Sequence, residues 1–179
     1  MTGREVAGRY GAIARGMTAR VEACTDWSMP TPCPEWTARD IVDHVVDVHR
    51  RALALLGTDL PPHADDPMRA WSAASAAMFA ALQDPTQATR VVSPRFGDMP
   101  FEQLASRMVC SDALVHTWDL ARATHQDEHL DAGAVEFAWT WMQGVGDNLR
   151  ASGDFGPPVD PPPDADIQTR LLCFLGRAV

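Results

Sequence analysis

The chain has 179 residues, 46% of them hydrophobic, and a formal net charge of −9. This length is typical of one domain, here residues 1–179, and the acidic balance argues against nucleic-acid binding, which requires a basic surface. No segment approaches the roughly 20 consecutive apolar residues of a membrane span, and the N-terminus lacks an apolar signal core, so we expect no membrane contact and a cytoplasmic protein.

The first half of the chain is predicted to form three helices. The first begins after Thr2 and runs to about residue 23, because its apolar residues recur at intervals of three and four. Prolines within residues 30–34 exclude a helix there and make a stiff connection. Thr37 caps a second helix that ends at Gly57, and the pair Asp66-Pro67 opens a third helix that runs to about residue 82.

The second half is predicted to contain an extended excursion and three more helices. The excursion covers residues 88–99, with a turn at 96–98. A fourth helix spans residues 100–124 and a fifth spans 131–149, while the Gly- and Pro-rich residues 152–163 form a loop. A short terminal helix follows at 166–175. The fold class is therefore all-α, a four-helix bundle with a long crossover, a short extended excursion and a C-terminal helix.

Polar residues interrupt the apolar stripe of the fourth helix. The stripe is formed by Phe101, Ala105, Met108, Val115 and Ala123. Asp112, His116 and Asp119 fall on the same stripe, at positions i, i+4 and i+7. Burying an unpaired carboxylate and an imidazole costs several kcal/mol unless something compensates. A divalent metal would compensate, because a carboxylate and a histidine one turn apart form half of such a site.

His44 is the candidate third ligand. On the second helix it lies about 60° from the centre of the apolar face, whereas His49 lies about 80° off on the other side, so the two cannot easily share one ion. Packing of the second helix against the fourth would bring His44 to Asp112 and His116. The other three histidines lie in predicted loops, where nothing orients them: His63, His125 and His129.

Each of these residues also has a purely structural interpretation. His44 could be a core histidine whose hydrogen bonds are satisfied, and Asp112 with His116 could be an ordinary buried hydrogen-bonded pair. Asp119 could orient an imidazole by accepting its hydrogen bond, or it could cap another polar group. Periodicity alone leaves these alternatives open.

Three segments of the chain resemble a known superfamily. They are residues 31–44 (TPCPEWTARDIVDH), 112–124 (DALVHTWDLARAT) and 171–177 (LLCFLGR). The first two are similar to the second-helix and fourth-helix signatures of DinB-like proteins, in the branch related to the N-terminal domain of mycothiol-dependent maleylpyruvate isomerase. The third resembles the tail of compact, single-domain, metal-binding members.

The resemblance implies a metal site. In that family one histidine from the second helix and a carboxylate-x-x-x-histidine pair from the fourth hold the metal, which implies His44, Asp112 and His116 here. Asp112 stands where the isomerase has glutamate. The isomerase also has a C-terminal domain that contributes to its active site, and we expect no such domain within these 179 residues.

The resemblance also implies an enzyme of thiol chemistry. Zinc is the expected metal, although two nitrogens and one oxygen also suit nickel, iron or manganese. The metal would activate a low-molecular-weight thiol such as mycothiol for S-transfer to an electrophilic small molecule, or for addition and isomerisation. Asp119 is the candidate catalytic residue. The alternatives are a metal-assisted hydrolase with Asp119 as base and a non-catalytic protein that binds a metal or small molecule.

Four further features complete the expectations. The four cysteines form no C-x-x-C pair and are expected to be reduced. Cys33, between two prolines, is the one cysteine considered as a nucleophile, with structural packing favoured. Arg122 could meet an anionic substrate, with an ion pair favoured instead. The outer helix faces carry enough apolar residues for a homodimer.

Overall fold

Four long helical runs form the body of the protein. The computed structural model describes residues 3–62, 64–95, 97–151 and 157–179. The runs are α1 (Gly3–Ala23), α2 (Ala38–Ala54), α3 (Pro67–Gln83), and the continuous segment α5 (Phe101–Leu104), η1 (Ala105–Val109) and α6 (Cys110–Ala123). The all-α fold class is confirmed, with one two-stranded sheet and an isolated bridge between Pro30 and Thr37 among the described residues.

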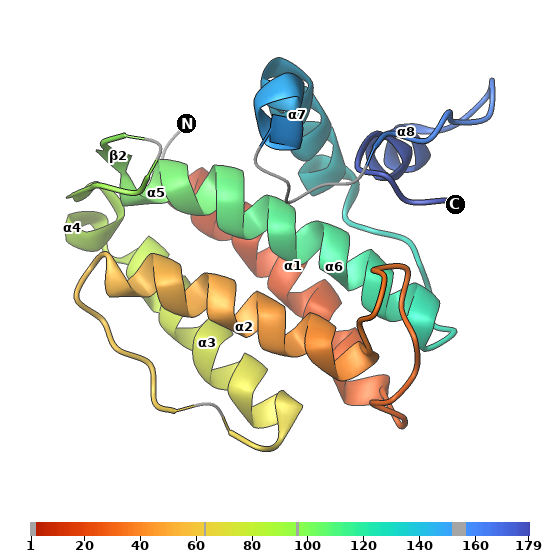
Figure 1. The fold of residues 1–179 in the computed structure, drawn as a ribbon. Coiled ribbons are helices and arrows are strands. Elements are labelled where there is room, and N and C mark those ends of the chain that lie inside the picture. Colours follow the sequence, from red (N-terminus) through yellow and green to blue (C-terminus); the bar gives the residue numbers. More distant parts are fainter. Residues whose placement is uncertain (1–2, 63, 96, 152–156) are drawn as a thin grey trace.

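The order of the helices around the bundle places α2 beside α6. Both α1 and α2 pack against α3 and α6, so α1 lies diagonally opposite α2. The connections 24–37 and 84–100 therefore each cross one end of the bundle (Figure 1). The apolar face of α2, which includes Ile41, Val45 and Leu53, is fully buried. Burial of this face fixes the rotation of α2, and with it the direction in which His44 points.

The helix starts follow the capping signals in the sequence. Thr37 accepts a hydrogen bond from the Asp40 backbone, and the Asp40 carboxylate accepts one from Thr37 N at 2.8 Å. This reciprocal capping box satisfies two backbone donors that the first turn would leave unpaired. Asp66 caps α3 in a similar way, with Pro67 at its first position. The second helix ends earlier than predicted, at Ala54, and Gly57 with φ 73° closes the turn that follows.

The predicted fourth helix is interrupted by a π-helical segment. Residues 105–109 form η1, so the run from residue 101 to 123 is not the uniform α-helix that the apolar spacing predicts. The predicted extended excursion is present as strand β1 (Val91–Val92), paired antiparallel with β2 (Met99–Pro100). A short helix α4 (Pro85–Ala88) precedes it. Residue 96 of the predicted turn lies outside the described residues.

Two further helices lie on the outer side of α6, and the first of them packs against it. They are α7 (Ala132–Ala151) and α8 (Ile167–Phe174). They pack against each other, and α7 also contacts α1 and α6 (Figure 1). Of the predicted loop, residues 152–156 lie outside the described residues and 157–163 are not helical. In the described part of the chain, none of the helices has the length and apolar character needed to cross a membrane.

Candidate metal centre

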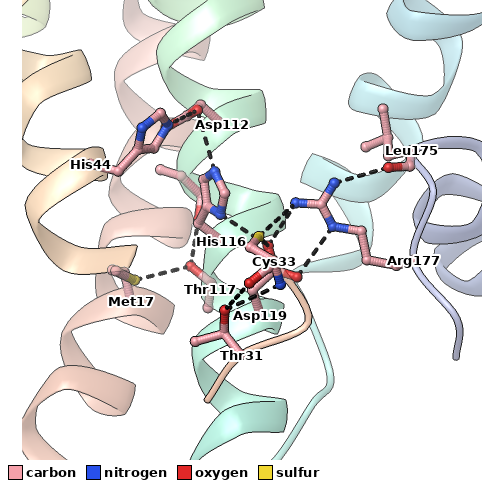
Figure 2. Close-up of polar contacts among 11 residues, drawn as sticks. Met17, Thr31, Cys33, His44, Asp112, His116, Thr117, Asp119, Leu175 and Arg177 are labelled. Atoms are coloured by element: carbon pink, nitrogen blue, oxygen red, sulfur yellow. Dashed lines mark hydrogen bonds and ion pairs between the residues drawn. The ribbon is translucent and has the colours of Figure 1, made fainter. Parts of the chain in front are cut away.

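The three predicted ligands meet where α2 packs against α6. The Nε2 atom of His44 lies 3.0 Å from Oδ1 of Asp112, and the Nε2 atom of His116 lies 3.7 Å from the same oxygen. One donor atom from each of the three residues can be chosen so that all lie within 4.8 Å of one another. Figure 2 shows His44 approaching from α2, with Asp112 and His116 one turn apart on α6. The structure therefore brings together groups that are 68 residues apart in the sequence.

Asp119 fixes the ring of His116. Its Oδ2 atom lies 2.9 Å from Nδ1 of His116, and the Asp119 residue is 0% exposed. Burial opposes ionisation of Asp119, but hydrogen bonds from His116 and Arg177 outweigh it and hold the carboxyl pKa below its ordinary value. Because an ionised carboxylate only accepts hydrogen bonds, Nδ1 of His116 must carry the proton. When the ring is neutral, its lone pair is therefore on Nε2, which lies 3.7 Å from Oδ1 of Asp112.

The donor atoms of this cluster fit a divalent metal. Oδ2 of Asp112 is buried and has no hydrogen-bond partner among the described residues. The lone pair of His116 Nε2 faces the other oxygen of the same carboxylate. Two electron-rich groups that face each other in a partly buried site repel, whereas a cation between them would satisfy both. Two imidazole nitrogens and one carboxylate oxygen, with room for a further ligand, form the donor set of many catalytic zinc sites.

Trp36 covers the two histidines. Its ring stacks on His116, with centroids 5.7 Å apart and an interplanar angle of 25°, and its centroid lies 4.9 Å from that of His44. The proline-rich connection holds Trp36 there, because the Thr31 backbone bonds to that of Trp36. Sequence reasoning did not single out Trp36. Its place immediately before the helix cap Thr37 was the available signal, since a residue there often packs back onto its helix.

Arg177 and Cys33 lie behind Asp119. Arg177 donates from Nε to Oδ1 of Asp119 at 3.2 Å and from Nη2 to Oδ2 at 2.9 Å. The Cys33 thiol lies 3.5 Å from Oδ2 of Asp119 and 3.4 Å from Nη2 of Arg177. Burial and the Asp119 carboxylate raise the pKa of Cys33 to about 12. Cys33 is therefore a protonated thiol at neutral pH, which does not suit a nucleophile.

A second potential ligand set consists of Cys33, His116 and Asp119. It shares His116 with the first set but uses the side of the ring where Nδ1 already donates to Asp119. Asp119 is further engaged by Arg177, and Cys33 is protonated. These groups compensate one another without an ion. We therefore place the candidate metal centre at His44, Asp112 and His116.

The remaining candidates from the sequence lie away from this cluster. His49 is 0% exposed and contacts the hydroxyl of Tyr10 at 2.9 Å and the Val45 carbonyl at 2.8 Å. Arg122 pairs with Glu128 at 2.8 Å, so the ion-pair interpretation of Arg122 fits the structure. His129 is exposed and bonds Asp127, and His125 lies in neither ligand set. His63 lies outside the described residues. All four cysteines are free thiols.

The metal-centre residues form part of the wall of a cleft. It has a volume of about 1050 Å³ and runs between α2, the η1–α6 segment, the proline-rich connection and the C-terminal tail. Another hollow, of about 700 Å³, lies over α1 and α3, and no histidine or cysteine is among the described residues that line it. The larger cleft is therefore the candidate functional site, because it combines metal donors with space for a small molecule.

Comparisons with known proteins agree with the resemblance noted in the sequence. The family model of the mycothiol maleylpyruvate isomerase N-terminal domain matches residues 10–121. Two uncharacterized proteins from Mycobacterium tuberculosis, of the strains CDC 1551 / Oshkosh and ATCC 25618 / H37Rv, are each 33% identical over 154 residues. Each alignment covers 84% of this chain and 84% of the relative. No solved structure gives a significant match.

Proposed function

The chain belongs to the mycothiol maleylpyruvate isomerase N-terminal domain family, and on this premise we propose that it is a metal-dependent enzyme that uses a low-molecular-weight thiol. Mycothiol is the proposed cosubstrate, and the reaction is S-transfer to an electrophilic small molecule, or addition with isomerisation. His44, Asp112 and His116 are the proposed ligands of a divalent metal, with zinc the first choice.

One observation carries this proposal. One oxygen of the Asp112 carboxylate, Oδ2, is buried without a hydrogen-bond partner among the described residues, and the neutral tautomer of His116 directs its lone pair at the other oxygen of that carboxylate. An ordinary hydrogen-bonded pair would place a proton between His116 and Asp112, whereas the neutral tautomer fixed by Asp119 has its proton on the Asp119 side. A metal ion bound here would lower the pKa of a coordinated thiol, so that the thiolate nucleophile is available at neutral pH.

The surrounding residues have supporting roles in this proposal. Asp119 was the candidate catalytic residue, but it is fully buried behind His116 and bonded to Arg177, so we assign it a positioning role. A hydrogen bond from a ligand histidine to a carboxylate fixes the ring and raises its basicity. The same burial argues against Asp119 as the base of a hydrolase, since Asp119 does not reach the cleft. Trp36 shields the two imidazoles from water on one side.

Metal content tests the ligand assignment. Elemental analysis of the purified protein is expected to find one divalent ion per chain, and His44→Ala and His116→Ala should each lose most of it, because two ligands remain. His129→Ala is the matched control, since His129 is exposed and away from the cleft. If both ligand variants keep the full metal content of the control, the assignment is wrong.

Thiol chemistry is tested separately. The metal-loaded and metal-depleted proteins are incubated with mycothiol and a panel of electrophiles, and products are identified by mass spectrometry. A metal-dependent thiol adduct or isomer is the expected result. Hydrolysis products without an adduct would instead indicate a hydrolase. Metal binding without any product across the panel would contradict the proposed activity and favour a binding protein.

A further inference from the structure

The cleft at the metal centre is positively charged in an acidic protein. Among the described residues that line it, Asp112 is the one acid. Four arginines also line it: Arg51, Arg95, Arg107 and Arg177. The whole chain has 24 acidic and 15 basic residues, so the cleft lining has the opposite balance. Asp112 is itself a proposed metal ligand and would be neutralised by the ion. The excess of positive charge therefore favours an anionic ligand.

Two of these arginines, Arg51 and Arg107, form no ion pair with an acidic side chain in the described part of the chain. In contrast, Arg177 pairs with Asp119. With the Gln103 amide oxygen facing it, Arg107 donates to Gln103 at 2.6 and 2.9 Å, and its guanidinium lies 5.2 Å from the centre of the Trp141 ring. These neutral groups orient Arg107, and within the described residues they do not compensate its charge.

Helix geometry places both arginines at one end of the cleft. Arg51 follows His44 by seven residues on α2, which is about 10 Å along the helix axis. Arg107 precedes Asp112 by five residues on the opposing run, which is about 7 Å. Because α2 and α6 lie side by side and run in opposite directions (Figure 1), both displacements point the same way from the metal centre. Arg177 lies at the other end, beside Asp119.

We propose that Arg51 and Arg107 together bind the carboxylate of a small organic acid, the electrophilic substrate of the metal centre. The position of the substrate relative to the metal rests on the proposed function, whereas the anion site rests on the two arginines. A guanidinium presents paired donors that match the two oxygens of a carboxylate. A carboxylate between the two arginines would also remove the repulsion between them. The rest of the molecule would then extend toward His44 and His116.

Succinate is a suitable probe because it carries carboxylates but is not an electrophile. Its affinity is measured by calorimetry at low ionic strength, with metal-loaded and with metal-depleted protein. We expect Arg51→Gln and Arg107→Gln each to weaken binding about tenfold or more, the effect of losing one charged hydrogen bond. Arg69→Gln is the matched control, since it removes the same charge from an exposed site on α3 outside the cleft. Thermal unfolding of each variant confirms that it is folded.

Two results would overturn the anion site. One is unchanged succinate binding in both cleft variants, and the other is equal binding of the neutral dimethyl succinate. The experiment also separates this proposal from the thiol chemistry, because it needs neither metal nor thiol. Arginine-dependent succinate binding by a protein without thiol activity would overturn the proposed function alone. Thiol activity with arginine-independent succinate binding would overturn the anion site alone.

Discussion

At the scale of single residues, the buried Asp119 carboxylate has two roles. Its contact with His116 sets which nitrogen of that ring carries the proton, and its ion pair with Arg177 gives the partly buried guanidinium a counter-ion. Neither role requires Asp119 to touch a substrate. A change at Asp119 should therefore alter metal affinity and stability together, whereas a residue that acts only on substrate would alter neither.

Asp119→Asn is expected to weaken metal binding by about 10- to 100-fold, the usual effect of removing a carboxylate that supports a ligand histidine. It should also destabilise the protein by about 3 kcal/mol, because the partly buried Arg177 would lose its counter-ion. Metal affinity is measured by competition with a chromophoric chelator, and stability by urea unfolding. Asp127→Asn is the control, since it breaks a similar Asp–His contact, to His129, at the surface. Equal metal affinity in the two variants would contradict the positioning role of Asp119.

The sequence contained part of this site. Helical periodicity placed Asp112 and His116 on one face of the fourth helix and left His44 as a candidate at the flank of the second. The resemblance to the family then selected His44 as the third ligand. Arg177 could not be predicted in this way. It lies 58 residues beyond Asp119 and reaches it from the tail after α8, and no periodicity relates the two. Trp36 has the same difficulty, since the path of the proline-rich connection decides where its ring lies.

At the scale of secondary-structure elements, the helix starts were predicted well and the interior of the fourth helix was not. Caps are local, so Thr37, Asp66 and Asp166 define their helices without tertiary information. The π-helical turn at 105–109 has no comparable local signal. Burial of α6 on almost every side, including Trp118, was also hidden, because it depends on the packing of α7 over the outer face.

The cap of α2 contributes to the stability of the site, because α2 carries His44. Thr37→Ala should lower the free energy of unfolding by about 1 kcal/mol, since a backbone donor of the first turn loses its acceptor. Thr140→Ala is the matched control. Thr140 is exposed inside α7 and only bonds the Glu136 carbonyl, so alanine there should be neutral or slightly stabilising. Urea unfolding compares the two variants, and equal losses would show that the capping box does not stabilise α2.

At the scale of the whole molecule, the buried side of α2 couples folding to pH. His49 is enclosed by Tyr10, Trp71 and its own helix. Burial lowers the pKa of His49 to about 4, against the opposing effect of its hydrogen bond to the Val45 carbonyl. In the unfolded chain the pKa of a histidine is about 6.5. Between these two values the unfolded state binds a proton that the folded state does not, so folding loses free energy as the pH falls.

The size of this loss can be predicted. Above about pH 6.5, His49 should be neutral in both states and should not lower the free energy of unfolding. By pH 4.5 the free energy of unfolding should have fallen by about 2 to 3 kcal/mol, because each pH unit in this interval is worth about 1.4 kcal/mol. The test is urea unfolding of metal-depleted protein at pH 7.5 and 4.5.

The double variant Tyr10→Phe with His49→Phe keeps both rings but removes the titrating group. The difference in the free energy of unfolding between the two pH values should therefore shrink by about 2 to 3 kcal/mol. His129→Gln, at the surface, should keep the full difference. An undiminished pH effect in the double variant would show that His49 is not the group responsible.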